Sequence, residues 1–235
     1  MPIEDFEGET FVAFIDISGF KNLMKRAEAE RALNNFYQYG YDILNANNRQ
    51  NGCIKVDGIF ISDCGILFVR DNSNNLRDCL MTLLRLIRDI NIRMLQHDYI
   101  LTTSIAYGSF RYQSRIELIG IDKNLLYGNA YLDAYLDNDR EKPKIRPGQC
   151  RIVKTNLPDE IKNMIKYSSY QGNDGDNIFP MIRSVRSDRN HYYFYWMRQQ
   201  PDEIDEFEQK YRDANNLKYT GYVNVLKGKR RFFDS

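Results

Sequence analysis

Two acidic residues lie where apolar strands are expected to end. Asp16 closes an apolar stretch and precedes a Ser-Gly step and an amphipathic segment, and Asp63 lies at the tip of a hairpin over residues 58–69. Adjacent strands would bring the two carboxylates together, one of them beside a helix N-terminus, whose free N–H groups favour anions. Carboxylate oxygens also suit divalent cations bound to a polyphosphate. The residue types and their placement therefore predict nucleotide chemistry.

The elements that must position these acids follow from the hydrophobic pattern. Apolar residues recur near the 3.6-residue period in two long segments and alternate in the strand that follows them. We expect, in order, a strand at 10–17, a helix at 20–45, hairpin strands at 53–61 and 65–69, a helix at 74–96 and a strand at 100–110. This order is the split βαβ pattern of ferredoxin-like sheets, so an α+β fold is expected.

The second half of the chain has a more mixed pattern. We expect a glycine-opened helix at 125–137, a loop at 139–148, a strand at 150–153, a helix at 159–166, a polar loop at 171–177, a strand at 191–197, a helix at 202–215 and a basic tail at 227–233. Residues 1–155 are interpreted as the core. Residues 156–235 are interpreted as an α/β C-terminal extension packed on the same domain.

Composition excludes several classes of function. The 33 Lys and Arg nearly balance the 32 Asp and Glu, so the chain has no global field for nucleic acid or an anionic membrane. No export signal or apolar span of about 18 residues is visible, and we expect a cytoplasmic protein without nucleic-acid or membrane partners. The four cysteines form no CxxC pair, and the histidines, His97 and His191, lie far apart, so buried thiols are expected rather than a zinc site.

Two motifs resemble the class III nucleotidyl cyclase family. FIDISGF at 14–20 is similar to the motif that opens the family's catalytic core, and ISDCGILF at 61–68 is similar to the hairpin that carries its second metal ligand. TTSIAYGSF at 102–110 stands where the family has its fourth strand, and YGNAYLDAYLD at 127–137 where it has a glycine-led helix. The resemblance covers about residues 10–155.

The resemblance implies a two-metal site. Asp16 and Asp63 would hold two divalent ions, Mn²⁺ or Mg²⁺, with the backbone carbonyl of Ile17 as a further ligand. Three backbone N–H groups would receive the β- and γ-phosphates: those of Ser18, Gly19 and Phe20. The implied reaction is in-line attack of the ribose 3′-hydroxyl on the α-phosphate, which yields a 3′,5′-cyclic nucleotide and pyrophosphate.

Departures from the family pattern disfavour a purine substrate. The positions that would read a purine base are Ile59 and Leu125, and neither side chain offers a hydrogen-bonding group. The transition-state Asn and Arg of the family fall on Leu132 and Leu136. The GNAYLDAYLD form is similar to the bacterial pyrimidine cyclases of Pycsar antiphage systems. We therefore expect a uridylate cyclase that makes cyclic UMP from UTP, with cyclic CMP from CTP as the alternative.

Other side chains are candidates for the missing roles. Arg111 and Arg115, expected just beyond the fourth strand, could supply positive charge at the α-phosphate. The alternative, that both are ordinary exposed loop residues, is equally favoured. Tyr131 and Tyr135 could line the base pocket, because an aromatic face stacks and a phenol bonds a pyrimidine edge. Packing in a core or a dimer interface is the alternative for both tyrosines.

The resemblance also implies partners. Class III sites are composites of two subunits, so we expect a homodimer, and a separate effector protein would sense the cyclic product. Two other classes remain open: a non-catalytic nucleotide-binding module on the cyclase fold, and an RRM-like RNA-binding domain in which GILFVR at 65–70 supplies sheet aromatics. A diguanylate cyclase would need a Gly-Gly-acid-acid turn where this chain has SDCG.

Overall fold

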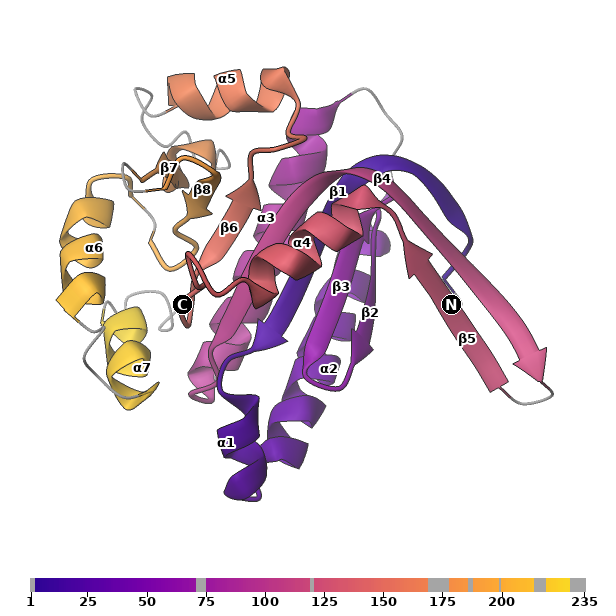
Figure 1. The fold of residues 1–235 in the computed structure, drawn as a ribbon, viewed down its shortest axis with the longest axis horizontal. Helices are drawn as coiled ribbons and strands as arrows, with labels where there is room; N and C mark the ends of the chain where they lie inside the picture. The colour runs from indigo at the N-terminus through magenta and orange to yellow at the C-terminus, as the bar shows by residue number, and fades with distance from the viewer. Residues whose placement is uncertain are drawn as a thin grey trace.

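A mixed sheet forms the centre of the molecule, with helices on both faces (Figure 1). The computed structural model describes residues 3–70, 75–118, 121–168, 178–185, 188–198, 200–213 and 219–228. The strand order is β2-β3-β1-β4-β6-β8-β7, and β5 pairs with β4 outside this path. The first four strands have the order of the split βαβ pattern, so the predicted α+β, ferredoxin-like core is confirmed.

The bounds of the elements are as follows. The strands are β1 (Phe6–Ile17), β2 (Val56–Ile61), β3 (Cys64–Val69), β4 (Leu101–Leu118), β5 (Ile121–Tyr127), β6 (Cys150–Val153), β7 (Ile182–Ser184) and β8 (His191–Phe194). The helices are α1 (Phe20–Lys25), α2 (Ala29–Asn48), α3 (Leu76–Gln96), α4 (Asn129–Asp139), α5 (Asp159–Ser168), α6 (Glu203–Asp213) and α7 (Tyr219–Lys227), with a short 3₁₀ turn at Phe179–Met181. Among the described residues, no helix is both long and apolar enough to cross a membrane.

Strand β1 is buried on both faces. Phe11, Ala13 and Ile15 pack in the large core beneath α2 and α3, whereas Val12 and Phe14 pack in a second core on the α4 side of the sheet. A strand covered on both faces needs apolar side chains at consecutive positions, which accounts for its unbroken apolar run. Because α4 covers the second face, the open aromatic face of an RRM-like domain is absent from the described sheet, and that alternative is wrong.

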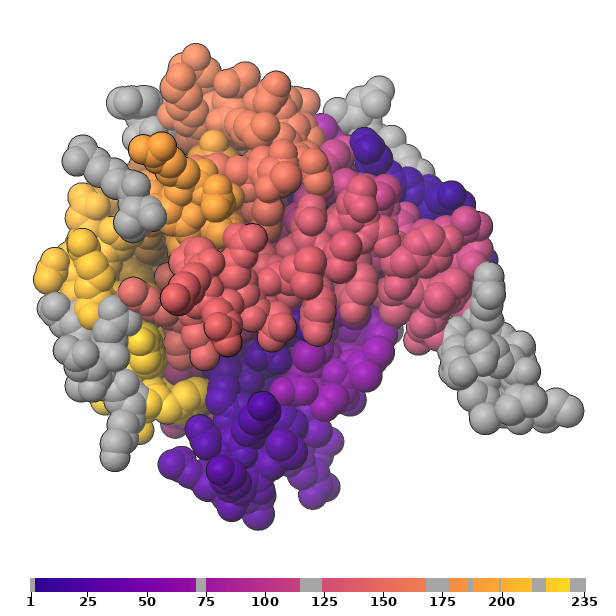
Figure 2. All heavy atoms as spheres, in the orientation of Figure 1, coloured from indigo at the N-terminus to yellow at the C-terminus, as the bar shows by residue number. Residues whose placement is uncertain are grey.

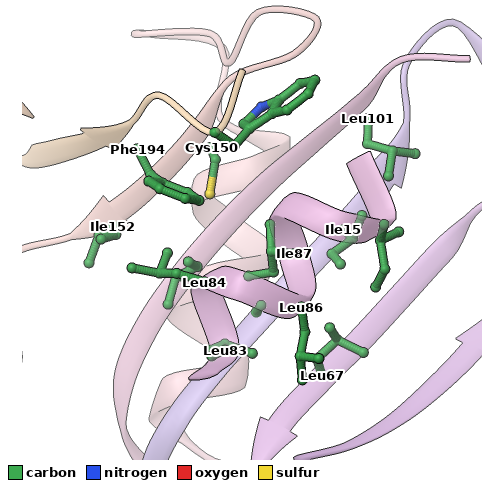
Figure 3. Close-up of a cluster of buried hydrophobic side chains, with 14 of the residues drawn as sticks. Ile15, Leu67, Leu83, Leu84, Leu86, Ile87, Leu101, Cys150, Ile152 and Phe194 are labelled. Atoms are coloured by element: carbon green, nitrogen blue, oxygen red, sulfur yellow. The ribbon is translucent and has the colours of Figure 1, made fainter. Parts of the chain in front are cut away.

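Helix α3 contributes many of the buried side chains of the large core. Its N-terminus is capped by Asn75, whose Oδ1 accepts a hydrogen bond from the Asp78 N–H at 3.1 Å. Figure 3 shows the inner side of α3 with its apolar side chains among those of four strands: Leu83, Leu84, Leu86 and Ile87 beside Ile15, Leu67, Ile152 and Phe194. The predicted helix at 74–96 therefore docks on the sheet through one apolar face.

The single helix predicted at 20–45 is wrong, because the chain breaks after α1. Ala27 has a left-handed φ of 58°. The Glu28 N–H donates to the Leu23 carbonyl at 3.0 Å, and the Ala27 N–H donates to the Met24 carbonyl at 3.2 Å. These two bonds form a Schellman motif, which ends α1. The apolar pattern runs across this break and so conceals it.

The helix predicted at 125–137 also begins too early. Residues 121–127 form β5, which pairs with the far half of β4, and the two strands project from the body as a long hairpin (Figure 1). The strand predicted at 100–110 accordingly extends to Leu118. Gly128 opens α4 with φ 129°, and a Cβ there would lie 2.3 Å from the Ser109 carbonyl oxygen. Glycine is therefore required where α4 crosses β4.

The C-terminal extension joins the same sheet. β6 pairs in parallel with β4, and β8 pairs antiparallel with β6 and β7. The predicted strand at 191–197 ends at Phe194, and helix α7 lies where only a tail was expected. The polar loop predicted at 171–177 and most of the basic tail lie outside the described residues.

A buried polar network ties α4 to this extension. Asp137, in the last turn of α4, contacts His191 Nε2 at 2.7 Å and Arg151 Nη2 at 3.0 Å, and it accepts a hydrogen bond from the Ser104 hydroxyl. His191 Nδ1 lies 2.7 Å from Asp188. Burial alone raises the pKa of Asp137, but the His191 hydrogen bond and the Arg151 charge outweigh it and hold that pKa below its usual range. The network therefore keeps a buried carboxylate ionised.

We expect Ala27→Gly to stabilise the protein by about 1 kcal/mol, since glycine adopts the left-handed conformation without the cost that a Cβ imposes. Urea unfolding measures the change. Ala32→Gly, inside α2 and fully buried, is the matched control and should destabilise. Equal effects of the two substitutions would contradict the assigned break.

Candidate active site

The structure brings Asp16 and Asp63 together at the ends of adjacent strands. Asp16 lies opposite Cys64 in the antiparallel β1–β3 ladder, and Asp63 occupies the turn that joins β2 to β3. One ligand atom from each of Asp16, Asp63 and Cys64 lies within 4.8 Å of the others. Two carboxylates at this spacing form a candidate divalent-metal site.

The hairpin turn is held in place by local contacts. Ser62 has a left-handed φ of 55°, and its hydroxyl donates to Asp63 Oδ1 at 3.1 Å. The Asp63 carbonyl accepts a hydrogen bond from the Ile17 N–H at 3.0 Å. The backbone of the turn is thus fastened to the end of β1, and Asp63 stays beside Asp16.

The electrostatics of the site are unfavourable without a cation. Partial burial, followed by the charge of Asp63 and that of Asp139, raises the pKa of Asp16 to about 6. The Cys64 thiol donates to Asp16 Oδ1 at 3.5 Å. Burial and both carboxylates raise the pKa of this thiol to about 12. At neutral pH Cys64 is therefore a thiol, and the negative charge of the site belongs to the two acids.

The donor set fits hard divalent cations. Two carboxylates supply oxygen ligands, which Mg²⁺ and Mn²⁺ prefer, while the single sulfur is protonated. A bound cation would offset the repulsion that raises the pKa of Asp16. Asp16 and Asp63 are thus the residues that could hold the two predicted ions, and sequence reasoning did not include Cys64 in the cluster.

The turn after β1 carries the predicted phosphate donors and departs from expectation at one of them. Gly19 adopts φ 75° at the start of α1, a conformation that favours glycine, and Phe20 opens the helix. The Ser18 N–H donates to the Ile100 carbonyl at 2.8 Å, so it is already used. The Ser18 hydroxyl is buried and has no partner among the described residues. Of the predicted phosphate donors, the Gly19 and Phe20 amides remain.

An aromatic residue of the extension lies against this turn. A Cβ built on Gly19 would contact the Tyr219 ring at 3.6 Å, and the Tyr219 hydroxyl accepts a hydrogen bond from the Ile100 N–H at 2.8 Å. Tyr219 therefore positions the loop that follows β1. Sequence reasoning missed it because nothing in the pattern of residues 219–227 links them to residues 18–20.

Helix α4 presents two different sides. Tyr131 and Tyr135 stack with ring centroids 6.3 Å apart, and the Tyr135 ring meets Phe14 edge-on at 5.3 Å. These tyrosines thus contact the sheet of their own subunit. Leu132 and Leu136 are 50% and 52% exposed. Apolar side chains therefore face solvent at the two positions where the family has Asn and Arg.

The two predicted base-reading positions do not meet. Ile59 is 5% exposed and packs in the core beneath α4, in register with Phe14 and Ser104. Leu125 lies on β5 opposite Gln113, nine residues farther along β4 than Ser104, or about 30 Å of strand. Leu125 therefore lies on a strand, and the prediction that it belongs to a helix is wrong.

The predicted arginines are also distant from the acids. Arg111 and Arg115 lie within β4 rather than beyond it. Arg111 pairs with Glu7 at 3.3 Å and lies over the Tyr127 ring, and Glu7 is nine residues from Asp16 on β1, about 30 Å of strand. Position 111 and, farther along the same strand, position 115 therefore lie far from the two carboxylates of their own subunit.

The fold is that of the class III nucleotidyl cyclase catalytic domain. The catalytic core of a rhodopsin-guanylyl cyclase with converted specificity, solved with ATPαS, is similar with a TM-score of 0.52 and 16% identity over 81% of this chain and 96% of that one. A dimeric guanylyl cyclase domain of the RhoGC fusion protein from Blastocladiella emersonii has a TM-score of 0.51 and 11% identity over 81% and 94%. Scans of protein-family models and of curated proteins give no match.

We expect Asp16→Asn to stabilise the metal-free protein at pH 7 by about 1–2 kcal/mol, after allowance for solvent screening. The folded pKa of Asp16 is raised to about 6 from 3.8, so the wild type loses stability as pH rises through this window, and the uncharged amide does not. The difference should vanish below about pH 4. Urea unfolding in EDTA measures it.

With Mn²⁺ the wild type should become more stable than Asp16→Asn, because the ion binds the folded wild type and not the amide variant. Asp42→Asn, exposed on α2, is the control and should leave the metal response unchanged. An equal response to Mn²⁺ in Asp16→Asn would contradict the assigned ligand.

Proposed function

We propose that the protein is a nucleotide cyclase that converts UTP to 3′,5′-cyclic UMP and pyrophosphate, as a second messenger in antiphage defence. The observation that carries the proposal is the pairing of Asp16 and Asp63 at adjacent strand ends of a cyclase fold, beside the glycine turn that opens α1. The rhodopsin-guanylyl cyclase core that this chain resembles was solved with a nucleoside triphosphate analogue, which supports the substrate class.

The residues divide the work of cyclisation. When bound, two divalent ions lower the pKa of the ribose 3′-hydroxyl and neutralise charge on the departing pyrophosphate. Asp16 and Asp63 hold the ions, with the Ile17 carbonyl as a further ligand. The Gly19 and Phe20 amides would bind the terminal phosphates, and the Ile17–Asp63 hydrogen bond keeps the two acids side by side.

The choice of UTP rests on what the sheet offers a base. Ile59 stands where a purine-reading lysine is expected and is enclosed among apolar neighbours, so it supplies no hydrogen-bond donor. Tyr131 and Tyr135 are polar-tipped side chains of the same face, and a phenol can bond a pyrimidine edge. CTP remains the alternative, because the two bases differ by one exocyclic group.

An apolar surface favours a homodimer. Five large hydrophobic side chains of α4 and β5 are more than a third exposed: Leu125, Tyr127, Leu132, Tyr135 and Leu136. Helix α4 lies in the middle of the face shown in Figure 2. Such a surface marks a protein interface, and a second copy would place its own α4 against it by two-fold symmetry.

One observation favours a second candidate, a nucleotide-binding module without catalysis. The exposed Leu132 and Leu136 leave α4 without a cation for the α-phosphate. Binding without turnover would follow if no residue of the partner subunit replaced it. The two metal acids, which binding alone does not need, support the enzyme.

We expect the purified protein with Mn²⁺ to form cyclic UMP as the main product when ATP, GTP, CTP and UTP compete in one reaction. Asp63→Ala should reduce this turnover to below about one hundredth while the melting temperature stays within a few degrees, because the side chain buries little apolar area. Mass spectrometry identifies the product, and Asp42→Ala is the matched control.

Cyclic AMP or cyclic GMP as the main product would refute the pyrimidine proposal, and cyclic CMP would select the alternative. UTP binding without any product, measured by calorimetry, would select the non-catalytic module.

We expect Leu136→Arg to convert the dimer to a monomer and to abolish turnover, since a charge on an apolar interface loses its solvation without a partner. Sedimentation velocity measures the mass. Tyr167→Arg, on the exposed face of α5, is the matched control and should leave the dimer intact. A monomeric wild type that retains activity would contradict the composite site.

A further inference from the structure

A cavity of ≈230 Å³ lies between the C-terminal extension and the loop that precedes β6. The loop before β6, strand β8 and helix α6 form its walls, and none of the Asp16–Asp63 site residues lines it. Pockets for drug-sized ligands have volumes of about 300–1,000 Å³, so this one suits a single ring with a small substituent.

Aromatic side chains make up much of the wall. The lining includes Tyr193, Phe194, Tyr195, Phe207 and Tyr211. Phe207 and Tyr211 stack with centroids 5.4 Å apart, and the Tyr195 ring meets Phe207 edge-on at 6.1 Å. Walls of this kind favour a planar ring through stacking and edge-to-face contacts.

The loop that closes the cavity is fastened by side chains from three other elements. The Tyr211 hydroxyl donates to the Pro147 carbonyl at 2.7 Å, and the Trp196 indole N–H donates to the Gly148 carbonyl at 2.8 Å. Arg151 Nη1 donates to the Pro143 carbonyl at 2.9 Å. The cavity is therefore preformed, and a ligand would bind with little ordering cost.

The two acids that line the cavity already have hydrogen-bond partners in the protein. Asp188 accepts a hydrogen bond from the Tyr193 hydroxyl at 2.6 Å and lies against His191, and Glu208 accepts one from the Tyr195 hydroxyl. Three cations also line the wall: Lys144, Arg146 and Arg212. Within the part of the chain that the structure describes, none of these cations forms an ion pair with an acid. The cavity thus offers positive charge beside an aromatic wall.

We propose that this cavity binds a small aromatic anion, one planar ring that carries a carboxylate or a phosphate. The ring lies against Phe207 and Tyr211, and the anion meets the half-buried Arg146, whose planar guanidinium matches either group in a bidentate manner. The site is separate from the metal acids, so it stands or falls independently of cyclase activity.

Methyl NMR of protein labelled at its methionines tests the proposal, because Met197 lines the cavity and Met197→Leu assigns its signal. Benzoate and phenyl phosphate are the probes, which distinguish the two anionic groups. Benzyl alcohol, which lacks the charge, and inorganic phosphate, which lacks the ring, are the matched controls. We expect a saturable shift of the Met197 signal with at least one aromatic anion and binding about tenfold or more weaker for both controls.

Variants assign the response to the cavity. Arg146→Gln should weaken binding by about tenfold, through loss of a charge-assisted hydrogen bond, whereas Arg49→Gln, exposed at the end of α2, should not change it. Val185→Trp should fill the cavity and abolish the shift. No saturable shift with either anion, an undiminished shift in Arg146→Gln, or equal binding of inorganic phosphate would overturn the proposal. If Val185→Trp does not fold, the comparison of Arg146→Gln with Arg49→Gln decides.

Discussion

The antiparallel pairing of β1 with β3 is the constraint on which the site depends. It sets Asp16 opposite Cys64, and the tight turn between β2 and β3 then holds Asp63 beside Asp16. Burial of the Asp16 carboxylate, and then repulsion by Asp63, raise the pKa of Asp16 and oppose folding. Burial of β1 on both faces offsets that cost, because α2 and α3 cover one side and α4 the other. The core thus holds together two charges that would separate in a free chain.

The parts of the fold that sequence predicts well are those with local signals. Hydrophobic periodicity and turn residues predict three elements: the strand that ends at Asp16, the hairpin that carries Asp63 and the long amphipathic α3. The break at Ala27 does not, because alanine is a good helix former and the apolar stripe continues past it. The start of α4 was misplaced since the apolar residues before Gly128 fit a strand and a helix equally well.

Long-range contacts account for the rest of what sequence could not show. Two of the contacts that tie the extension to the core illustrate this: Tyr219 packs on the glycine turn after β1, and His191 bridges Asp137 and Asp188. Neither contact has a local pattern, because its partners lie far apart in the chain and its chemistry is visible only after folding. Both contacts act on elements of the proposed site, the phosphate loop and α4. The extension is therefore part of the machinery that positions the site.

The two faces of α4 explain how one helix can serve both packing and assembly. Ala130 and Ala134 are fully buried, and such small side chains let the helix lie close to β1 and β4. Leu132 and Leu136 point outward from the same two turns and remain half exposed. Full burial of a leucine contributes about 1.5–3 kcal/mol, so two copies of this face would gain substantially from meeting. The family's Asn and Arg at these positions would stabilise negative charge in a transition state, but they would bury less apolar area on association. The exposed leucines therefore suit α4 to the proposed homodimer, and in the proposed reaction other side chains would have to stabilise the α-phosphate.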